Sequence, residues 1–345
     1  MKKIFSFFLA LTVLFCAGCA KNVEYKSSDF FAMNTYATIT ADCTEDILSR
    51  AKSLVFDIEN QLSATIAESD INNLSNTERE TYDETISLLS YAKEISDATD
   101  GAFDFTLGTL VRLWNITGDA PTLPQKDEIE EALSHCGFEK TNLSDGKFSC
   151  DDKKLSVDLG GIAKGYAGQK VAEFLKEKGV CDASVYLGGN VTVIGSSPSN
   201  RKKGVLGWNV AINNPFDTAD ILGVVTLCDK TVSVSGSYER YFELDGEIYH
   251  HILDSKTGYP ARSDLASVAV IAADGTLADG LSTAFFVMGL EKSVDFYKSG
   301  IFDFEAIFCT NDRKVFVTDG LQKSFTPNFD AKSSDQLSIL FPDYR

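Results

Sequence analysis

The sequence predicts an α+β fold, a mostly antiparallel sheet with packed helices, because helical and strand-like segments gather in separate runs. The first half is mainly helical in pattern. Residues 183–271 instead hold short segments rich in Val, Ile and Tyr, separated by Gly-Gly, Asn-Pro and Asp-Gly. Such runs favour α+β over a doubly wound fold, in which strands and helices alternate. At 345 residues and 44% hydrophobic content, the chain can bury a substantial core.

Each expected element follows from its own periodicity. Residues 30–40 alternate large and small side chains like a strand, and residues 44–60 repeat apolar positions at helical spacing. The remaining expected elements, in chain order, are helices at 83–98 and after Pro124, a strand from 148 to Val157, a helix from about 160 to 179, strands between 183 and 271, helices at 275–288 and 290–299, and strands at 304–309 and 313–318.

The first residues, MKKIFSFFLALTVLFCAGCA, have the pattern of an export signal: two lysines, a short apolar run and small residues before Cys19. The end of this segment resembles a bacterial lipobox, so we expect residues 1–18 to be a lipoprotein signal peptide and Cys19 to be lipidated. Simple secretion with cleavage nearby is the alternative. Residues 19–28 would form a tether to one domain at 29–345, and the lipid would anchor it to a bacterial membrane facing the periplasm or exterior.

The formal net charge of −18 restricts the ligands that the protein can bind. So acidic a chain repels nucleic acid, and we expect no nucleic-acid partner. An anionic ligand must therefore be bound by a local positive group, such as a metal ion or a helix N-terminus. Beyond the signal, the cysteines form no CxxC pair and no zinc spacing, and both disulfides and free thiols remain open; these are Cys43, Cys136, Cys150, Cys181, Cys228 and Cys309.

The segment DLGGIAKG, residues 158–165, predicts a strand that turns into a helix near Gly160 and Gly161. Unhindered backbone amides and the positive end of the helix dipole would then face one spot, which suits a phosphate group. The pattern is neither a dinucleotide-binding GxGxxG nor a P-loop. Glycines that merely permit a tight turn are the alternative.

The segment ADGLSTAFF, residues 278–286, places Asp279 and Thr283 four residues apart on one face of an expected helix. A carboxylate and a hydroxyl there could bind a hard cation such as Mg²⁺, which takes few protein ligands and completes its shell with water and substrate phosphate. The alternative is an aspartate that caps the helix and a threonine that packs.

The segment HHILDSKTGYP, residues 250–260, holds two of the three histidines of the chain. A histidine at a strand end is available for acid–base chemistry near neutral pH. The turns at 188–190 (GGN) and 234–241 (VSGSYERY) contain glycines that let a backbone approach a ligand. Ordinary turn chemistry explains each of these segments equally well when it is taken alone.

Taken together and in this order, the segments MNTY, DLGGIAKGYA, GGN, SGSYER, HILDSKTGYP and ADGLSTAFF resemble the FAD:protein FMN transferase family, often called ApbE. The resemblance extends from about Met33 to about Val317. It implies a T-fold-like architecture and an exported enzyme. Such an enzyme splits the FAD pyrophosphate with Mg²⁺, moves FMN onto a Thr or Ser of a target flavoprotein and releases AMP.

The resemblance also implies roles for single residues. Asp279, Thr283 and the backbone carbonyl of Ala163 would hold Mg²⁺. His251 would act as general base for the incoming hydroxyl, or assist the phosphate electrostatically, while His250 points to the other side of its strand. The residues expected to hold FAD are Met33, Ala102, Phe103, Asp104, Asp158, Lys164 and Ile252.

This sequence departs from the family pattern at Ser255, where proline is usual, at Val234, where threonine is common, and at Thr65, where an aromatic is frequent. A missing aromatic would remove a stacking surface worth about 1 to 3 kcal/mol. We therefore also consider an FAD pyrophosphatase that yields FMN and AMP. A flavin-binding lipoprotein without catalysis is the alternative of another class, but it would need neither a metal site nor a base.

Overall fold

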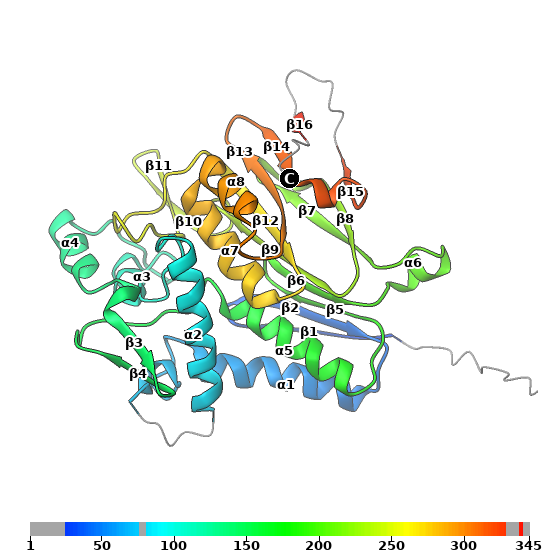
Figure 1. Cartoon of the computed structure of the whole chain (residues 1–345), viewed down its shortest axis with the longest axis horizontal. Coiled ribbons are helices and arrows are strands. Elements are labelled where there is room, and N and C mark those ends of the chain that lie inside the picture. Colours follow the sequence, from blue (N-terminus) through cyan, green and yellow to red (C-terminus); the bar gives the residue numbers. More distant parts are fainter. Residues whose placement is uncertain (1–24, 76–80, 329–337, 341–345) are drawn as a thin grey trace, which may run out of the picture.

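The computed structural model describes residues 25–75, 81–328 and 338–340, so the predicted signal peptide and Cys19 lie outside the described residues. One large sheet organises the chain (Figure 1). Its strands are β1 (Lys26–Ala32), β2 (Thr35–Ala41), β5 (Ala183–Leu187), β6 (Asn190–Ile194), β9 (Lys230–Gly236), β12 (Leu265–Ala272), β13 (Glu305–Thr310), β14 (Lys314–Val317) and β16 (Ser338–Leu340). They lie in the order β1-β2-β5-β6-β9-β12-β13-β14-β16, and every neighbouring pair is antiparallel except β14–β16.

Smaller sheets and helices surround this sheet. A three-stranded sheet contains β7 (Trp208–Asn214), β8 (Asp217–Leu227) and β15 (Phe325–Pro327), and two hairpins are β3–β4 (Thr141–Ser144, Lys147–Cys150) and β10–β11 (Tyr241–Leu244, Glu247–His250). The helices are α1 (Glu45–Leu62), α2 (Tyr82–Ala98), α3 (Gly108–Trp114), α4 (Lys126–Ser134), α5 (Ala163–Glu177), α6 (Pro198–Lys202), α7 (Gly275–Met288) and α8 (Leu290–Ser299), with 3₁₀ turns at Ile71–Asn73, Phe138–Lys140 and Asp319–Leu321. The predicted α+β class, with its mainly antiparallel sheet, is confirmed.

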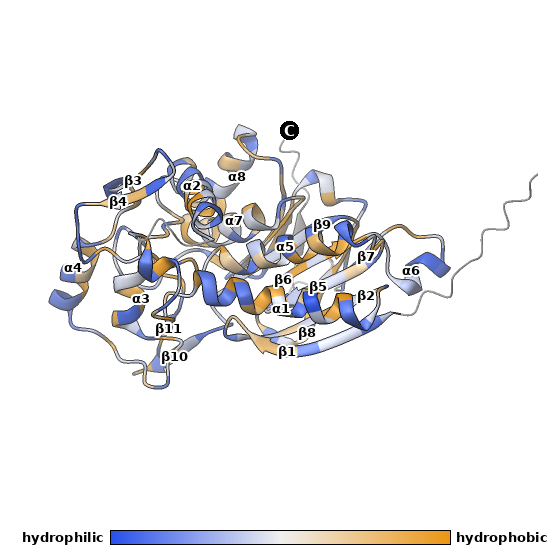
Figure 2. Ribbon diagram, turned by 90° about the horizontal axis from the view of Figure 1, so that it is seen from below, coloured by the Kyte–Doolittle hydropathy of each residue, from blue (hydrophilic) through white to orange (hydrophobic). Residues whose placement is uncertain are grey.

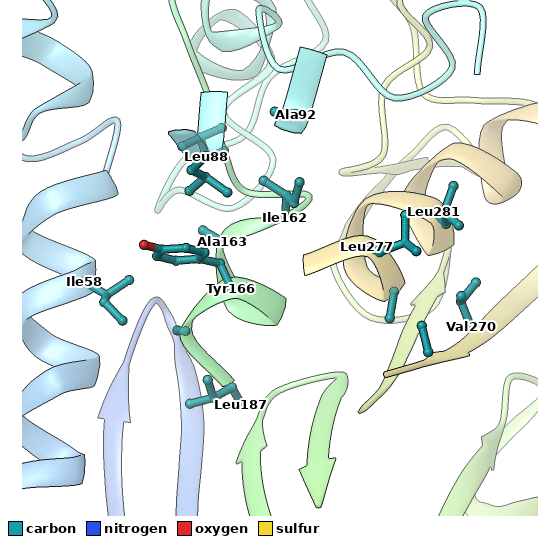
Figure 3. Packing of buried hydrophobic residues seen from close by; sticks show 14 of the residues in the cluster. Ile58, Leu88, Ala92, Ile162, Ala163, Tyr166, Leu187, Val270, Leu277 and Leu281 are labelled. Carbon is teal, nitrogen blue, oxygen red and sulfur yellow. The ribbon is translucent and has the colours of Figure 1, made fainter. Parts of the chain in front are cut away.

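Helices α1, α2, α5 and α7 pack on one face of the large sheet (Figure 1). Thr44 caps α1, and Leu48, Ala51, Val55 and Ile58 recur at helical spacing on its buried side. Figure 2 shows α1 with one hydrophobic and one hydrophilic side. Figure 3 shows the central contact, where residues of α5, α2 and α7 meet apolar residues of the strands. The main hydrophobic core therefore lies between the helices and this face.

The opposite face is covered only in part. A second core fills the space between the three-stranded sheet and strands β6, β9, β12, β13 and β14. On the same side of β1, β2 and β5, the side chains of Phe31, Tyr36 and Tyr186 are 66%, 55% and 40% exposed. This face of the sheet is therefore exposed beside the three-stranded sheet.

Some expected boundaries were wrong. Residues 30–40 form a hairpin and not one strand, because Met33 and Asn34 take left-handed φ values of 52° and 55°, as a two-residue hairpin turn requires. The expected strand up to Val157 ends at Cys150, where the Asp152 carboxylate accepts the Lys154 N–H and forms a turn.

Strand β1 also begins at Lys26, inside the segment expected to be a tether. Within the described ranges, no helix is both long and apolar enough to cross a membrane. The described cysteines, Cys43, Cys136, Cys150, Cys181, Cys228 and Cys309, are all free thiols.

Candidate active site

A cavity of about 900 Å³ opens beside the N-terminus of α5 and the turn between β5 and β6. Its volume suits a large cofactor or nucleotide. The sequence-predicted residues that line it are Ala102, Phe103, Asp104, Asp158, Lys164, His251, Ile252, Asp279 and Thr283. Met33 and Ala163 are not part of the wall: Met33 lies in the β1–β2 turn and donates its N–H to Glu59 Oε1 at 2.8 Å, and Ala163 is buried at the start of α5.

Close contact between α5 and α7 creates the centre of the site. A Cβ at Gly165 would lie 2.1 Å from the Gly275 carbonyl oxygen and 2.6 Å from Asp279 Cβ, so only glycine permits this approach. The contact brings the first turn of α5 to the middle of α7. The Gly165 N–H consequently donates to Asp279 Oδ2 at 2.8 Å.

Asp279 is 3% exposed and has no cationic partner among the described ion pairs. The described hydrogen-bond donors to its carboxylate are all neutral: Gly165 N–H, Asn190 Nδ2 at 3.1 Å and Ser233 Oγ at 2.8 Å. A buried carboxylate is normally paired with a cation or a metal. The expected alternative, a helix cap, is excluded because Asp274 caps α7 and Asp279 lies one turn further on.

The oxygen atoms around Asp279 suit a hard cation. Thr283 Oγ1 lies 3.4 Å from the Gly161 carbonyl oxygen, and Asn190 Oδ1 is a buried oxygen without a hydrogen-bond partner in the described part of the chain. Carboxylate, hydroxyl, amide and carbonyl oxygens are ligands that Mg²⁺ accepts. Residues 25–75, 81–328 and 338–340 contain no group of three or more His, Cys, Asp or Glu side chains placed to hold a metal ion. The candidate ligands around Asp279 are therefore a mixed set of oxygen atoms.

The turn that the sequence predicts to bind phosphate, residues 158–165, differs in detail from the expectation. Helix α5 begins at Ala163, later than expected, and the Gly160 N–H is already bound to Asp158 Oδ1 at 2.7 Å. Ile162 and Ala163 both donate to the Leu159 carbonyl oxygen. What the turn offers to an anion is therefore chiefly the Lys164 ammonium group, which lies 3.2 Å from the Gly160 carbonyl oxygen and lines the cavity.

Burial raises the pKa of Asp158, while the positive charges of Arg112 and Lys164 counteract this shift. Burial likewise raises the pKa of Asp104. Asp104 accepts from Thr106 N–H at 2.8 Å, from Thr106 Oγ1 at 2.6 Å and from Phe138 N–H at 3.3 Å. These bonds show that Asp104 fixes the shape of its own turn, and its neighbours Ala102 and Phe103 provide the cavity surface.

The two adjacent histidines point to different surroundings. His250 is buried, bonds through Nε2 to the Ala261 carbonyl oxygen at 2.9 Å and meets the Phe286 ring edge-on. His251 lines the cavity, and its Nδ1 lies 3.2 Å from the Arg240 carbonyl oxygen. Because a carbonyl can only accept, Nδ1 carries the proton and Nε2 keeps its lone pair.

The charge state of His251 follows from burial and from nearby cations. Burial lowers its pKa to about 3, and the positive charges of Arg240 and Lys164 act in the same direction. His251 is therefore neutral at physiological pH and able to take up a proton at Nε2.

Ser255 stands where proline is usual in the family, and hydrogen bonds hold the loop here instead. Ser255 Oγ donates to the Gly101 carbonyl oxygen at 2.7 Å, and the Lys256 ammonium group pairs with Asp100 at 2.6 Å. Asp254 and Thr257 form the turn itself, as in the simpler interpretation of this segment. The loop after His251 is thus tied to the turn that contains Ala102 and Phe103.

Sequence reasoning overlooked several residues of the site. Ser233 lies in β9 and Asn190 begins β6, and both donate to Asp279. Arg240 binds the Asn34 carbonyl oxygen at 2.8 Å through its side chain and the His251 ring through its backbone. One sequence signal could have revealed Ser233: Ser233 and Ser235 alternate with valines in an expected strand, so both hydroxyls lie on one face. If that face is buried, the hydroxyls need hydrogen-bond partners.

The fold and this site together define an α+β protein with a cavity that contains a candidate divalent-cation site, a lysine and a neutral histidine. Comparison with known proteins gives the family. The ApbE family model matches residues 33–308, and the chain belongs to the ApbE family.

Relatives and a solved structure extend this result. The chain is 36% identical to the FAD:protein FMN transferase of Treponema pallidum, over 68% of this chain and 67% of that protein. It is 32% identical to one from Klebsiella pneumoniae, over 82% and 88% of the two chains. The crystal structure of the ApbE protein of Thermotoga maritima superposes with a TM-score of 0.74 at 33% identity, covering 85% of this chain and 96% of that one.

Proposed function

We propose that this chain is an Mg²⁺-dependent FAD:protein FMN transferase. It would attach FMN through a phosphoester to a Thr or Ser of a target flavoprotein and release AMP. Its curated relatives carry the name of this transferase. The observation within this chain that carries the proposal is the buried Asp279 carboxylate, which lacks a cationic partner in the described residues and shares one cavity with Lys164 and His251.

The donor set fits a magnesium ion. Asp279, Thr283 and the Ala163 carbonyl would hold it, with the unpartnered Asn190 Oδ1 nearby as a further oxygen. When bound, such an ion neutralises charge on pyrophosphate oxygens. The three neutral donors on Asp279 keep its carboxylate in place whether or not a cation is present.

The transfer step breaks a phosphoanhydride bond and forms a phosphoester bond. The acceptor hydroxyl oxygen forms a bond to the FMN phosphorus, and the bond from that phosphorus to the bridging pyrophosphate oxygen breaks. AMP leaves with the bonding electron pair. The hydroxyl proton passes to His251 Nε2, which is free because Nδ1 donates to the Arg240 carbonyl.

The cations of the site serve both binding and proton transfer. Lys164 and Arg240 line the cavity and lower the pKa of His251. A pyrophosphate placed between them offsets their positive charge and therefore raises the pKa of His251. The substrate itself thus makes His251 a stronger base at the moment when a proton must be accepted.

A second activity, hydrolysis of FAD to FMN and AMP, has one observation in its favour. Thr65 is exposed in the turn after α1, bonds to Ser63 Oγ and does not line the cavity. A site that holds its dinucleotide without an aromatic at this position admits water more easily as the acceptor.

We also propose that the chain is exported and held on the membrane by a lipid on Cys19. The signal-like N-terminal pattern supports this part of the proposal. Cys19→Ser should move the protein from the membrane fraction to the soluble fraction. Continued membrane association would contradict lipid anchoring through this residue.

The proposed function is tested by incubating the purified chain with FAD and Mg²⁺, with and without a threonine-bearing flavoprotein from the same genome. AMP, free FMN and protein-bound flavin are then measured. AMP with an equal amount of flavin fixed to the acceptor supports the transferase. AMP with equal free FMN, unchanged by the acceptor, makes hydrolysis the main activity. Tightly bound flavin without any AMP would leave a non-catalytic flavin-binding protein.

A further inference from the structure

The cavity continues from the candidate active site into a second part, which we call the sheet groove. Its floor is Ser184 and Tyr186 of β5 with Val191 of β6, and its wall is strand β7. These residues line the same continuous cavity as Lys164 and Asp279. The sheet groove is therefore open to the phosphate site.

Strand β7 is an edge strand. It pairs with β8 on one side and ends the order β15-β8-β7 of its sheet (Figure 1). Trp208, Asn209, Val210 and Ala211 are consecutive and all line the cavity. Because successive side chains of a strand point to opposite faces, a wall that contains four consecutive residues exposes the backbone of this part of the strand as well.

The hydrogen bonds of β8 show which backbone groups point into the groove. Thr226 donates its N–H to Ser324, and Leu222 accepts at its carbonyl from Asn328, so alternate residues of β8 direct their backbone groups toward β15. The register then pairs Asn209 with Thr226 and Ala211 with Val224. In an antiparallel pair, these two β7 residues must direct N–H and C=O away from β8.

The outer edge of β7 has no protection of the usual kind. No backbone hydrogen bond joins Asn209 or Ala211 to another element in the described ranges. Its sequence, WNVAINN, contains no lysine or proline, which are the residues that commonly block edge pairing. An open edge inside a functional cavity is the arrangement that receives a peptide as an added strand.

We propose that the sheet groove binds the segment of the target flavoprotein that carries the acceptor hydroxyl, as an extended strand paired with the outer edge of β7. This inference rests on the proposed transferase function. The acceptor hydroxyl must reach the phosphate site, and the groove leads there past the Gly188-Gly189 turn. Six residues of β7 extend for about 20 Å, enough for several acceptor residues.

The floor predicts the chemistry of the acceptor segment. Val191 and Tyr186 face the groove, and Val193 is buried in the second core. Asn209, Ala211 and Asn213 lie on the exposed side of β7. Alternate side chains of an added strand would therefore meet an apolar floor, and the others would face solvent. We expect apolar residues at every second position beside the acceptor Thr or Ser.

The test removes one backbone N–H group at the outer edge of β7 and leaves the candidate active site unchanged. Ala211→Pro removes the outward N–H, and proline is tolerated where a strand N–H is not used in its own sheet. Ala211→Val keeps this N–H and is the matched control. Tyr186→Glu, an exposed floor position, is a second variant that does not depend on the folding of a proline strand.

The readout separates acceptor binding from chemistry. Each variant is incubated with FAD and Mg²⁺, with an acceptor protein that the unaltered chain modifies and also without it. We expect kcat/KM for the acceptor to fall about tenfold or more in Ala211→Pro and Tyr186→Glu, since one backbone hydrogen bond or one apolar contact is lost. AMP release without acceptor should stay within about twofold of the unaltered rate, and Ala211→Val should behave like the unaltered chain.

Amide hydrogen exchange gives a second readout that does not depend on activity. The acceptor protein should slow exchange at Asn209 and Ala211, whereas FAD alone should not. Unchanged transfer in both variants, or protection of these amides before acceptor is added, would overturn the inference; early protection would mean that another part of the chain or a second copy occupies the edge. If the unaltered chain modifies no acceptor, the proposed function itself fails, which is a different result.

Discussion

The candidate active site and the sheet groove differ in how far their polar groups are already engaged. Around Asp279, three donors from three elements are fixed on one carboxylate, and Asp158 and His251 each have a backbone partner. Along β7, backbone groups of Asn209 and Ala211 point into open space. One part of the cavity is organised in advance, and the other is available for pairing.

This difference matches the roles that we propose for the two parts. Preorganised groups stabilise a reaction because they need not reorganise when charge develops. Recognition of a protein segment instead benefits from main-chain hydrogen bonds that tolerate different sequences. We expect substitutions in the active site to affect AMP release, and substitutions in the groove to affect only the acceptor.

The largest effect is expected from Asp279→Asn. The neutral amide lacks the charge to hold a cation, and its NH₂ group cannot accept the hydrogen bonds that the carboxylate accepts. Several kcal/mol of transition-state stabilisation would be lost, which corresponds to about a thousandfold fall in AMP release. The measurement is AMP release at saturating FAD and Mg²⁺. Asp274→Asn, the same change at the cap of the same helix, is the control and should keep its activity.

A smaller fall in the transfer rate is expected from substitution of His251, and none from substitution of His250. His251→Gln removes the proton acceptor and should lower transfer about a hundredfold while FAD binding persists. His250→Gln should instead cost about 1 kcal/mol of stability and leave transfer near the original rate, because the described hydrogen bonds of the His250 side chain go to Ala261 and Ile252 of its own loop. Transfer kinetics and urea unfolding of both variants provide the comparison. Equal losses of transfer would contradict the separate roles.

Local patterns predicted much of the fold. The expected helix at 275–288 is α7 at its observed bounds, because the apolar periodicity of a helix depends only on residues close together in the sequence. The hairpin at Met33 was not foreseen, since its turn has left-handed residues without the glycine that usually marks them. Strand order depends on contacts between distant segments, so nothing local showed that β7 would be an edge.

The candidate site shows the same division. Helical spacing correctly placed Asp279 and Thr283 on one face of a helix that borders the cavity. The donors to Asp279 come from α5, β6 and β9, and no spacing rule connects those elements. The helix face shared by Asp279 and Thr283 could be predicted from the sequence. The hydrogen bonds that hold the Asp279 carboxylate in place could be seen only in the tertiary structure.

The close contact between α5 and α7 can be tested by a substitution at Gly165. Gly165→Ala would place a Cβ against the Gly275 carbonyl, and we expect a loss of about 3 kcal/mol in the free energy of unfolding because both atoms belong to packed helices. Gly179→Ala is the control: open space surrounds its position, and only its φ of +77° costs about 1 kcal/mol. Urea unfolding measures both. Similar losses would mean that the α5–α7 contact is more adaptable than its geometry indicates.

The smallest effect concerns pH. Since His251 has a pKa of about 3, its base form persists as the pH falls below 6, and kcat/KM for FAD should show no acid limb at the ordinary histidine value. Arg240→Gln removes a positive charge that lowers this pKa. The pKa of His251 should then rise, although burial, the larger cause, keeps it below its ordinary value.

The ratio of kcat/KM at pH 5 to that at pH 8 should therefore be smaller in Arg240→Gln than in the unaltered chain. Arg262→Gln removes an exposed arginine that pairs with Glu247 and should leave the ratio unchanged. A ratio that falls equally in both variants would show that net charge, and not the cation beside the His251 ring, controls the profile. A ratio unchanged in Arg240→Gln would indicate that His251 accepts no proton in the rate-limiting step, which leaves it the electrostatic role.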